Sequence, residues 1–308
     1  MTKKNLILGI ILACLLVVAY VYQGPFKDWK ITAGKPKNFL SGIDAEKIDK
    51  IEIDKNKETL LLTKESKGWK IGGTKDFYVS PDTAKSMIDK IKQASELDVV
   101  VASQDKEKKI SFHTDEDSGI KVKFMEGEKV LADFIVGKTT GDLLSTYISK
   151  PELEKTYLVS LNINNVFSRE DWYDRAIFSM DSTKISKIRF QYPTREFTIE
   201  KKTEGDKAEW KGTLPHEFPV SENKIAEVVN TIASLSAAMI PEQTFKGTGL
   251  EKNLIIVQVA GDGIDNTLMI GEADKDGNYY TKKGDSDNIY LISKEQRDIL
   301  DKQIEQLK

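Results

Sequence analysis

The sequence predicts an α+β protein, in which an N-terminal transmembrane helix precedes two similar tandem domains, each a mainly antiparallel sheet with a packed helix. Three observations predict this fold class: a long apolar N-terminal segment, a set of motifs that occurs twice in the same order, and strand-like alternation followed by serine-capped helices. A length of 308 residues also corresponds to about two domains. We expect a transmembrane anchor with a short cytoplasmic tail at 1–23, a linker at 24–42, a first repeat domain at 43–165, a helical bridge at 166–181 and a second repeat domain at 182–308.

The anchor is expected from the segment Leu6 to Tyr22, which reads LILGIILACLLVVAYVY and has no charged side chain. At about 1.5 Å per residue it would span roughly 25 Å as a helix, near the lower limit for crossing a bilayer. Lys3 and Lys4 precede it. Because basic residues flank the cytoplasmic side of such segments, we expect the N-terminus in the cytoplasm and the body outside a bacterial plasma membrane.

Two alternatives for this segment stay open. The first is a signal peptide that is cleaved near Val17-Val18-Ala19, and the second is a lipoprotein that is cut before Cys14. Cys14 is the only cysteine in the chain. The rest of the chain therefore has no disulfide, no thiolate nucleophile and no cysteine metal ligand.

The duplication is expected from ordered sequence matches. Ile48-Asp49-Lys50-Ile51-Glu52-Ile53 is similar to Ile185-Ser186-Lys187-Ile188-Arg189-Phe190. The later pairs are Trp69-Lys70 and Trp210-Lys211, Val79-Ser80 and Val220-Ser221, Phe134–Gly137 and Leu268–Gly271, and Tyr157–Ser160 and Tyr290–Ser293. The offset ranges from 133 (290 − 157) to 141 (210 − 69) residues. A solenoid repeat has a far shorter period, so the pattern indicates duplication of a whole domain.

Within each copy, short apolar runs punctuated by turns indicate antiparallel strands. Ser80-Pro81-Asp82 then has the form of a helix start, with serine as the N-cap and proline at the first helical position. Apolar residues at helical spacing predict helices near Pro81 to Ala94 and Glu222 to Leu235. A capping box at Ser293-Lys294-Glu295-Gln296 predicts a terminal helix.

Chemistry is sparse in this sequence, and no catalytic, cofactor-binding or metal-binding residue is predicted. The only histidines, His113 and His216, are not accompanied by a recognisable serine–acid arrangement, and without cysteines they cannot build the usual zinc sites. Asp274 to Asn278 fails the register of a calcium loop, because Gly277 falls at position 4 instead of 6. We therefore expect a hairpin turn there. Basic and acidic residues are interspersed, with 46 Lys+Arg against 49 Asp+Glu, so no basic stripe for nucleic acid is present.

Two pairs of repeated residues could have a functional or a structural role. Gly137 and Gly271 each follow an apolar strand, where a bend or bulge is the favoured interpretation and an active-site glycine the alternative. Trp69 and Trp210 could be stacking platforms for a sugar, but their fixed place in the strand pattern favours packing in the core.

These motifs carry a resemblance to a known family. The apolar N-terminal segment, Trp69-Lys70 ahead of Val79-Ser80-Pro81-Asp82, Gly137 ahead of Tyr157-Leu158-Val159-Ser160, and the bridge Asp171 to Phe178 are similar to the bacterial domain-of-unknown-function 4340 family. The resemblance covers nearly the whole chain. It implies an envelope protein that is often encoded beside an ABC exporter permease, its ATPase and a gliding-motility-type auxiliary protein. It brings no catalytic residues.

Two hypotheses about function follow. The first is a non-enzymatic, membrane-tethered accessory or binding protein of the bacterial envelope, associated with an ABC-type export system through a permease or auxiliary protein. It needs no cofactor and binds no nucleic acid, and the sequence leaves its oligomeric state open. The second is an envelope hydrolase or sugar-modifying enzyme that uses paired carboxylates. Two carboxylates in one cleft, one with a raised pKa, would favour the enzyme.

Overall fold

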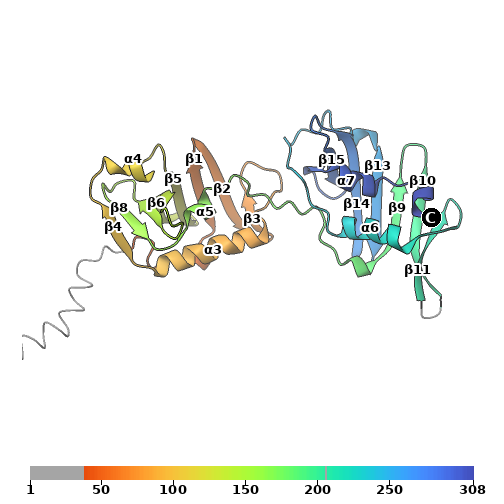
Figure 1. The fold of residues 1–308 in the computed structure, drawn as a ribbon, viewed down its shortest axis with the longest axis horizontal. Helices are drawn as coiled ribbons and strands as arrows, with labels where there is room; N and C mark the ends of the chain where they lie inside the picture. The colour runs from red at the N-terminus through yellow and green to blue at the C-terminus, as the bar shows by residue number, and fades with distance from the viewer. Residues whose placement is uncertain (1–37, 205–206) are drawn as a thin grey trace, which may run out of the picture. The chain divides into compact units, whose positions relative to one another are not determined.

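The computed structural model describes residues 38–204 and 207–308, and the chain divides into two compact units. The chain forms two eight-stranded sheets (Figure 1). The strands of the first sheet are β1 (Lys50–Lys55), β2 (Glu58–Glu65), β3 (Gly68–Ile71), β4 (Val99–Ser103), β5 (Ile120–Glu126), β6 (Lys129–Thr139), β7 (Thr146–Ser149) and β8 (Thr156–Val159). Its helices are η1 (Ala45–Lys47), α3 (Pro81–Glu96), α4 (Lys108–Phe112) and α5 (Asn164–Phe167).

The second sheet repeats this plan. Its strands are β9 (Ile185–Gln191), β10 (Glu196–Glu204), β11 (Lys207–Leu214), β12 (Phe218–Pro219), β13 (Ile255–Gly261), β14 (Ile264–Ala273), β15 (Tyr279–Lys283) and β16 (Ile289–Ile292). The accompanying helices are η2 (Ser182–Lys184), α6 (Glu222–Ala233), η3 (Leu250–Lys252), α7 (Lys294–Leu300) and α8 (Ile304–Leu307). The order of neighbouring strands is β3-β2-β1-β5-β6-β7-β8-β4 in the first sheet and β12-β11-β10-β9-β13-β14-β15-β16 in the second. From β3 to β8 and from β11 to β16 the two orders are the same.

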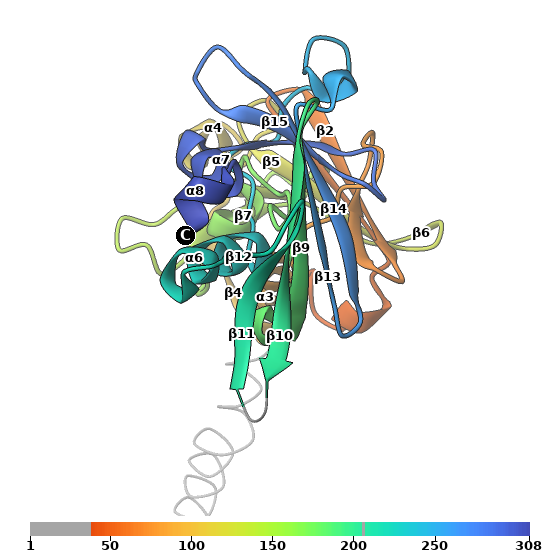
Figure 2. The same cartoon turned by 90° about the vertical axis from the view of Figure 1, so that its right-hand side faces the viewer.

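The core of each unit lies between its sheet and its long helix. Alternate residues of the central strands point inward, as Ile51 and Ile53 do in β1 and as Ile188 and Phe190 do in β9. In the second unit the inward face of α6 adds a buried apolar stripe, and Figure 2 shows α6, α7 and α8 on one side of the sheet. The opposite side of each sheet carries the polar half of the alternation.

The predicted α+β class is wrong. The described residues form mostly antiparallel sheet with few helices, and only α3 and α6 are longer than two turns. The predicted N-terminal transmembrane helix is not supported either. Neither 38–204 nor 207–308 contains a helix long and apolar enough to cross a membrane, and the predicted segment Leu6 to Tyr22 lies outside the described residues.

The predicted helical bridge at 166–181 is also wrong over most of its length, since the only helix there is the end of α5. The carboxylates of Asp171 and Asp174 accept hydrogen bonds from the backbone N–H groups of Tyr173 and Ala176, at 3.1 and 3.0 Å. Such local bonds offer the backbone an alternative to the helix. The Met180 N–H bonds to the Ala233 carbonyl at 2.8 Å, so the segment runs extended along the end of α6.

Other predicted elements are confirmed. Helices begin at Pro81 and Glu222, and the capping box at Ser293 and Gln296 starts α7. The terminal helix is broken, however, between Leu300 and Ile304. At the break the hydroxyl of Tyr192 donates to the Lys302 carbonyl at 2.7 Å, which ties this backbone to the edge of the β9–β10 hairpin.

Candidate functional site

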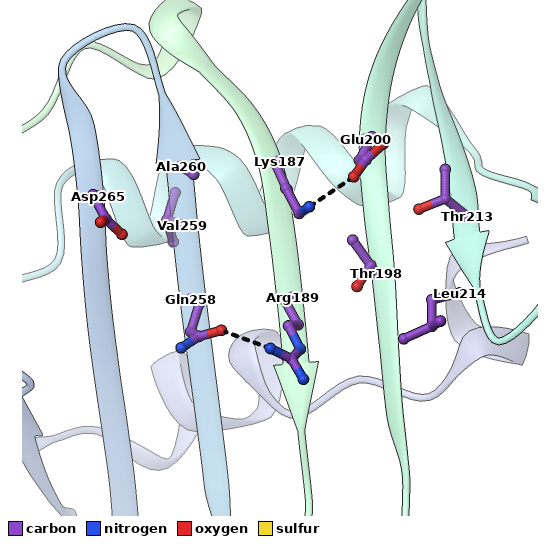
Figure 3. A pocket seen from close by; sticks show the side chains of 10 residues that line it. All are labelled: Lys187, Arg189, Thr198, Glu200, Thr213, Leu214, Gln258, Val259, Ala260 and Asp265. Carbon is purple, nitrogen blue, oxygen red and sulfur yellow. Dashed lines mark hydrogen bonds and ion pairs between the residues drawn. The ribbon is translucent and has the colours of Figure 1, made fainter.

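The polar face of the second sheet, opposite α6, holds a pocket of about 480 Å³. Figure 3 shows its side chains, which stand on neighbouring strands of the sheet. The lining residues are Lys187 and Arg189 from β9, Thr198 and Glu200 from β10, Thr213 and Leu214 from β11, Gln258, Val259 and Ala260 from β13, and Asp265 from β14. The polar side chains project here because they alternate along the strands with buried core residues such as Ile188, Phe190 and Ile199. We call this surface the open face of the second sheet.

Charges on the open face are paired across strands. Lys187 Nζ lies 2.8 Å from Glu200 Oε1, and Arg189 lies 2.5 Å from Glu196 Oε2 and 3.4 Å from Gln258 Oε1. The hydrogen bond from Lys187 lowers the pKa of Glu200, and the hydrogen bond from Arg189 lowers the pKa of Glu196. Both carboxylates therefore stay ionised at neutral pH, as acceptors and not as proton donors.

The first sheet has a smaller pocket of about 260 Å³ at the corresponding place. Its lining includes Glu52 of β1 and Lys123 of β5, whose Oε1 and Nζ atoms are 3.1 Å apart. The hydrogen bond with Glu52 raises the pKa of Lys123. We call the surface around this pocket the open face of the first sheet.

The linings of the two pockets share a pair of equivalent positions. Glu52 faces Lys123 between β1 and β5, and Arg189 faces Gln258 between β9 and β13. Since the Ile48–Ile53 motif matches Ile185–Phe190, Glu52 and Arg189 are the same position of the repeat. Both repeats therefore carry a polar cross-strand pair at this point, with an acidic residue on β1 and a basic residue on β9.

Residues considered for chemistry from the sequence do not come together. His113 is the exposed C-cap of α4, and exposed His216 stacks edge-on against Phe218 with 6.1 Å between ring centroids. The segment Asp274 to Asn278 is a hairpin turn, as predicted, in which Asp274 Oδ1 accepts from the Asn278 N–H at 2.8 Å. Across 38–204 and 207–308 no three His, Cys, Asp or Glu side chains gather in a way that could hold a metal ion.

The repeated tryptophans and glycines are structural. Trp69 and Trp210 are 4% and 7% exposed, which confirms their place in the core. The strand pairing shifts register at both glycines, between Val136 and Thr139 and between Ile270 and Ala273, so a bulge is present at each, as predicted.

A model of the family described as "Domain of unknown function (DUF4340)" matches residues 69–238 and again residues 210–308. The chain belongs to the DUF4340 family. The two DUF4340 matches begin at Trp69 and Trp210, the equivalent tryptophans of the two repeats. No curated protein and no solved structure matches the chain significantly.

Sequence reasoning did not single out the open faces of this DUF4340 protein. The only signal was polar residues at every second position, as in Ser186-Lys187-Ile188-Arg189-Phe190. Any strand with one solvated face shows that pattern. The register between strands, which places Arg189 beside Gln258 and Glu52 beside Lys123, comes from the structure alone.

Proposed function

We propose that this DUF4340 protein is a non-enzymatic accessory protein of the bacterial envelope, which binds a subunit of an ABC-type export system through the open faces of its two sheets. The observation that carries the proposal is the polar pair that both repeats carry on their open faces, Glu52–Lys123 and Arg189–Gln258. Two linked binding faces raise the effective concentration of the second contact once the first has formed. Arginine is enriched at protein interfaces, and complementary charges steer two partners together.

The chemistry of the open face supports binding more than catalysis. A glycoside hydrolase needs one carboxyl group whose pKa is raised, so that it can donate a proton. Where a carboxylate in the described parts of the chain has a displaced pKa, the displacement is downward, as for Glu196 and Glu200. Glu200 is held by Lys187 and suits an interface of complementary charges.

Location at the plasma membrane, with the body outside the cytoplasm, is part of the proposal. The apolar sequence from Leu6 to Tyr22 supports a membrane location, and Lys3 and Lys4 ahead of it support this orientation. The partner is expected to be a permease or its auxiliary protein, because the family resemblance implies that gene neighbourhood.

The test is purification of the tagged full-length chain in mild detergent from its bacterial host, followed by crosslinking and mass spectrometry. We expect recovery of a permease or auxiliary protein, with crosslinks that map to β9, β10 and β13. The charge reversal Lys187→Glu with Arg189→Glu should reduce that recovery at least several-fold. Lys246→Glu, an exposed lysine outside the pocket, is the matched control and should leave recovery unchanged. Repeated recovery of the protein alone, or turnover of an envelope polymer by the isolated protein, would overturn the proposal.

A further inference from the structure

The β6–β7 hairpin of the first sheet and the β14–β15 hairpin of the second sheet occupy equivalent places. Pairing resumes beyond the glycine bulge at Thr139 and Thr146 in the first hairpin, and at Ala273 and Tyr279 in the second. The tip of the second hairpin, 274–278, reads Asp-Lys-Asp-Gly-Asn. The hairpin therefore forms at this position without any apolar side chain in its turn.

The tip of the first hairpin, 140–145, is different. It carries two adjacent leucines, Leu143 and Leu144, which are 67% and 69% exposed. They are among the most exposed large apolar side chains in the described residues. The equivalent turn at 274–278 has no apolar side chain, so packing of the sheet does not account for the two leucines.

Hydrogen bonds hold this leucine tip in one conformation. The Thr140 N–H bonds to the Ser145 carbonyl at 2.9 Å, and the Leu144 N–H bonds to Asp142 Oδ1 at 3.0 Å. From outside the loop, Asn162 Nδ2 donates to the Leu143 carbonyl at 3.0 Å. The tip's one carboxylate is thus turned back onto its own loop, while the leucines project into solvent. A preorganised tip loses little conformational entropy when it binds.

The backbone of the leucine tip is also strained. Leu143 has a φ of 62°, in the left-handed region that disfavours a bulky L side chain. The second tip places Gly277 in that region, with a φ of 85°. Burial does not offset the strain at Leu143, because its side chain is exposed. Leu143 is exposed and has a strained backbone, whereas the equivalent position of the second hairpin is Gly277. This difference indicates that Leu143 has a role other than stabilising the fold.

We propose that Leu143 and Leu144 insert into the interfacial layer of a lipid bilayer and hold the first domain against the membrane surface. Amphipathic helices bury apolar side chains at the boundary between headgroups and acyl chains, and the same burial of apolar area favours insertion of exposed leucines. The inference rests on the membrane location proposed above and not on the transporter partner. Residues 23–37 join the apolar segment to the first described residue, Asn38. At about 3.3–3.6 Å per residue these positions span at most roughly 50 Å, so the domain stays within reach of the bilayer.

The experiment uses the full-length chain with Cys14→Ser and Gly141→Cys, labelled at position 141 with the environment-sensitive dye bimane. A Cβ at Gly141 meets no atom within 4 Å, so a cysteine side chain has room at this position. The chain is reconstituted into vesicles of phosphatidylethanolamine and phosphatidylglycerol with nitroxide-labelled lipid. We expect a blue shift of the dye and quenching by the lipid nitroxide. A chain labelled instead through Lys275→Cys, at the polar tip of the second hairpin, should show neither.

The deciding variant is Leu143→Gly with Leu144→Ser. Glycine accepts the φ of position 143, so the variant should fold at least as well as the parent chain. Its quenching should fall several-fold. Quenching that is unchanged in this variant would overturn the inference, and so would a dye that stays in water although the chain floats with the vesicles. The second result leaves the membrane location intact. If the chain does not float with the vesicles, both the insertion of the leucines and the proposed membrane location are overturned.

Discussion

Gly137 and Gly271 are held at the same point of the two repeats by the same close backbone approach. A Cβ built at Gly137 would lie 2.4 Å from the Phe112 carbonyl oxygen, and one at Gly271 would lie 2.2 Å from the Thr248 carbonyl oxygen. Phe112 and Thr248 lie in the segments that lead to β5 and β13. Neither carbonyl can move away from its glycine without shifting that segment. The repeated glycine is therefore a packing requirement of this sheet.

Replacing either glycine with alanine should destabilise its own unit. Gly137→Ala and Gly271→Ala force a methyl group into backbone atoms, and such overpacking costs about 1–3 kcal/mol. Urea denaturation of the full-length chain measures the loss. Gly141→Ala is the control, because its methyl group meets nothing within 4 Å. Equal stability of Gly137→Ala and Gly141→Ala would show that the close approach is absent.

The two serine caps should behave differently on substitution. Ser293 Oγ accepts from the Gln296 N–H at 3.1 Å, and Gln296 Oε1 accepts from the Ser293 N–H at 2.9 Å. Ser221 stands at the N-cap of α6 but makes no side-chain capping bond. We expect Ser293→Ala to cost about 1 kcal/mol and Ser221→Ala much less. Thermal unfolding of the two variants side by side checks this, and an equal cost would contradict the assigned geometry.

Local signals in the sequence predicted the elements they control. The Ser-Pro-Asp start, the capping box at Ser293 and the Asp-Gly turn at 276–277 each depend on a few neighbouring residues, and each is present. The bridge at 166–181 failed because its apolar side chains Trp172, Ile177 and Phe178 are buried without a helix. The apolar pattern shows that these side chains are buried, but it does not determine the backbone conformation. The hydrogen bonds of Asp171 and Asp174 to the local backbone hold it in a non-helical conformation. The domain boundaries, partner and location remain predictions.

The open faces could not be predicted from the sequence, because their content is a relationship between strands. Arg189 and Gln258 are far apart in sequence and are neighbours only through the β9–β13 register. The pattern does show that each is on a solvated face. It does not show which strands are adjacent, since β10, β11, β12 and α6 lie between β9 and β13 in the sequence.

The Lys187–Glu200 pair should make stability depend on pH in the acid range. The pKa of Glu200 is lowered from 4.5, chiefly by the hydrogen bond from Lys187. A lowered folded-state pKa contributes stability above the unfolded value, and this contribution is lost as pH falls through the folded value. Glu200→Gln should therefore cost up to about 1 kcal/mol at pH 7 and nothing well below pH 4. Denaturation at both pH values tests the sign, with exposed Glu217→Gln as the control. A larger effect in acid would contradict it.

The first sheet should stay stable when the charges of Glu52 and Lys123 are exchanged, but not when both positions carry the same charge. Lys123 is the cross-strand partner of Glu52 and also faces Asp133 of β6. Lys123→Glu would place three carboxylates on adjacent strands, and like charges directly opposite are destabilising by about 1 kcal/mol or less per pair. Glu52→Lys in the same chain restores one attraction, so the double variant should regain part of the loss. A double-mutant cycle by urea denaturation measures the coupling between the two positions. If the second substitution adds to the first without recovery, the two side chains do not interact, and the central pair loses its place in the proposed binding face.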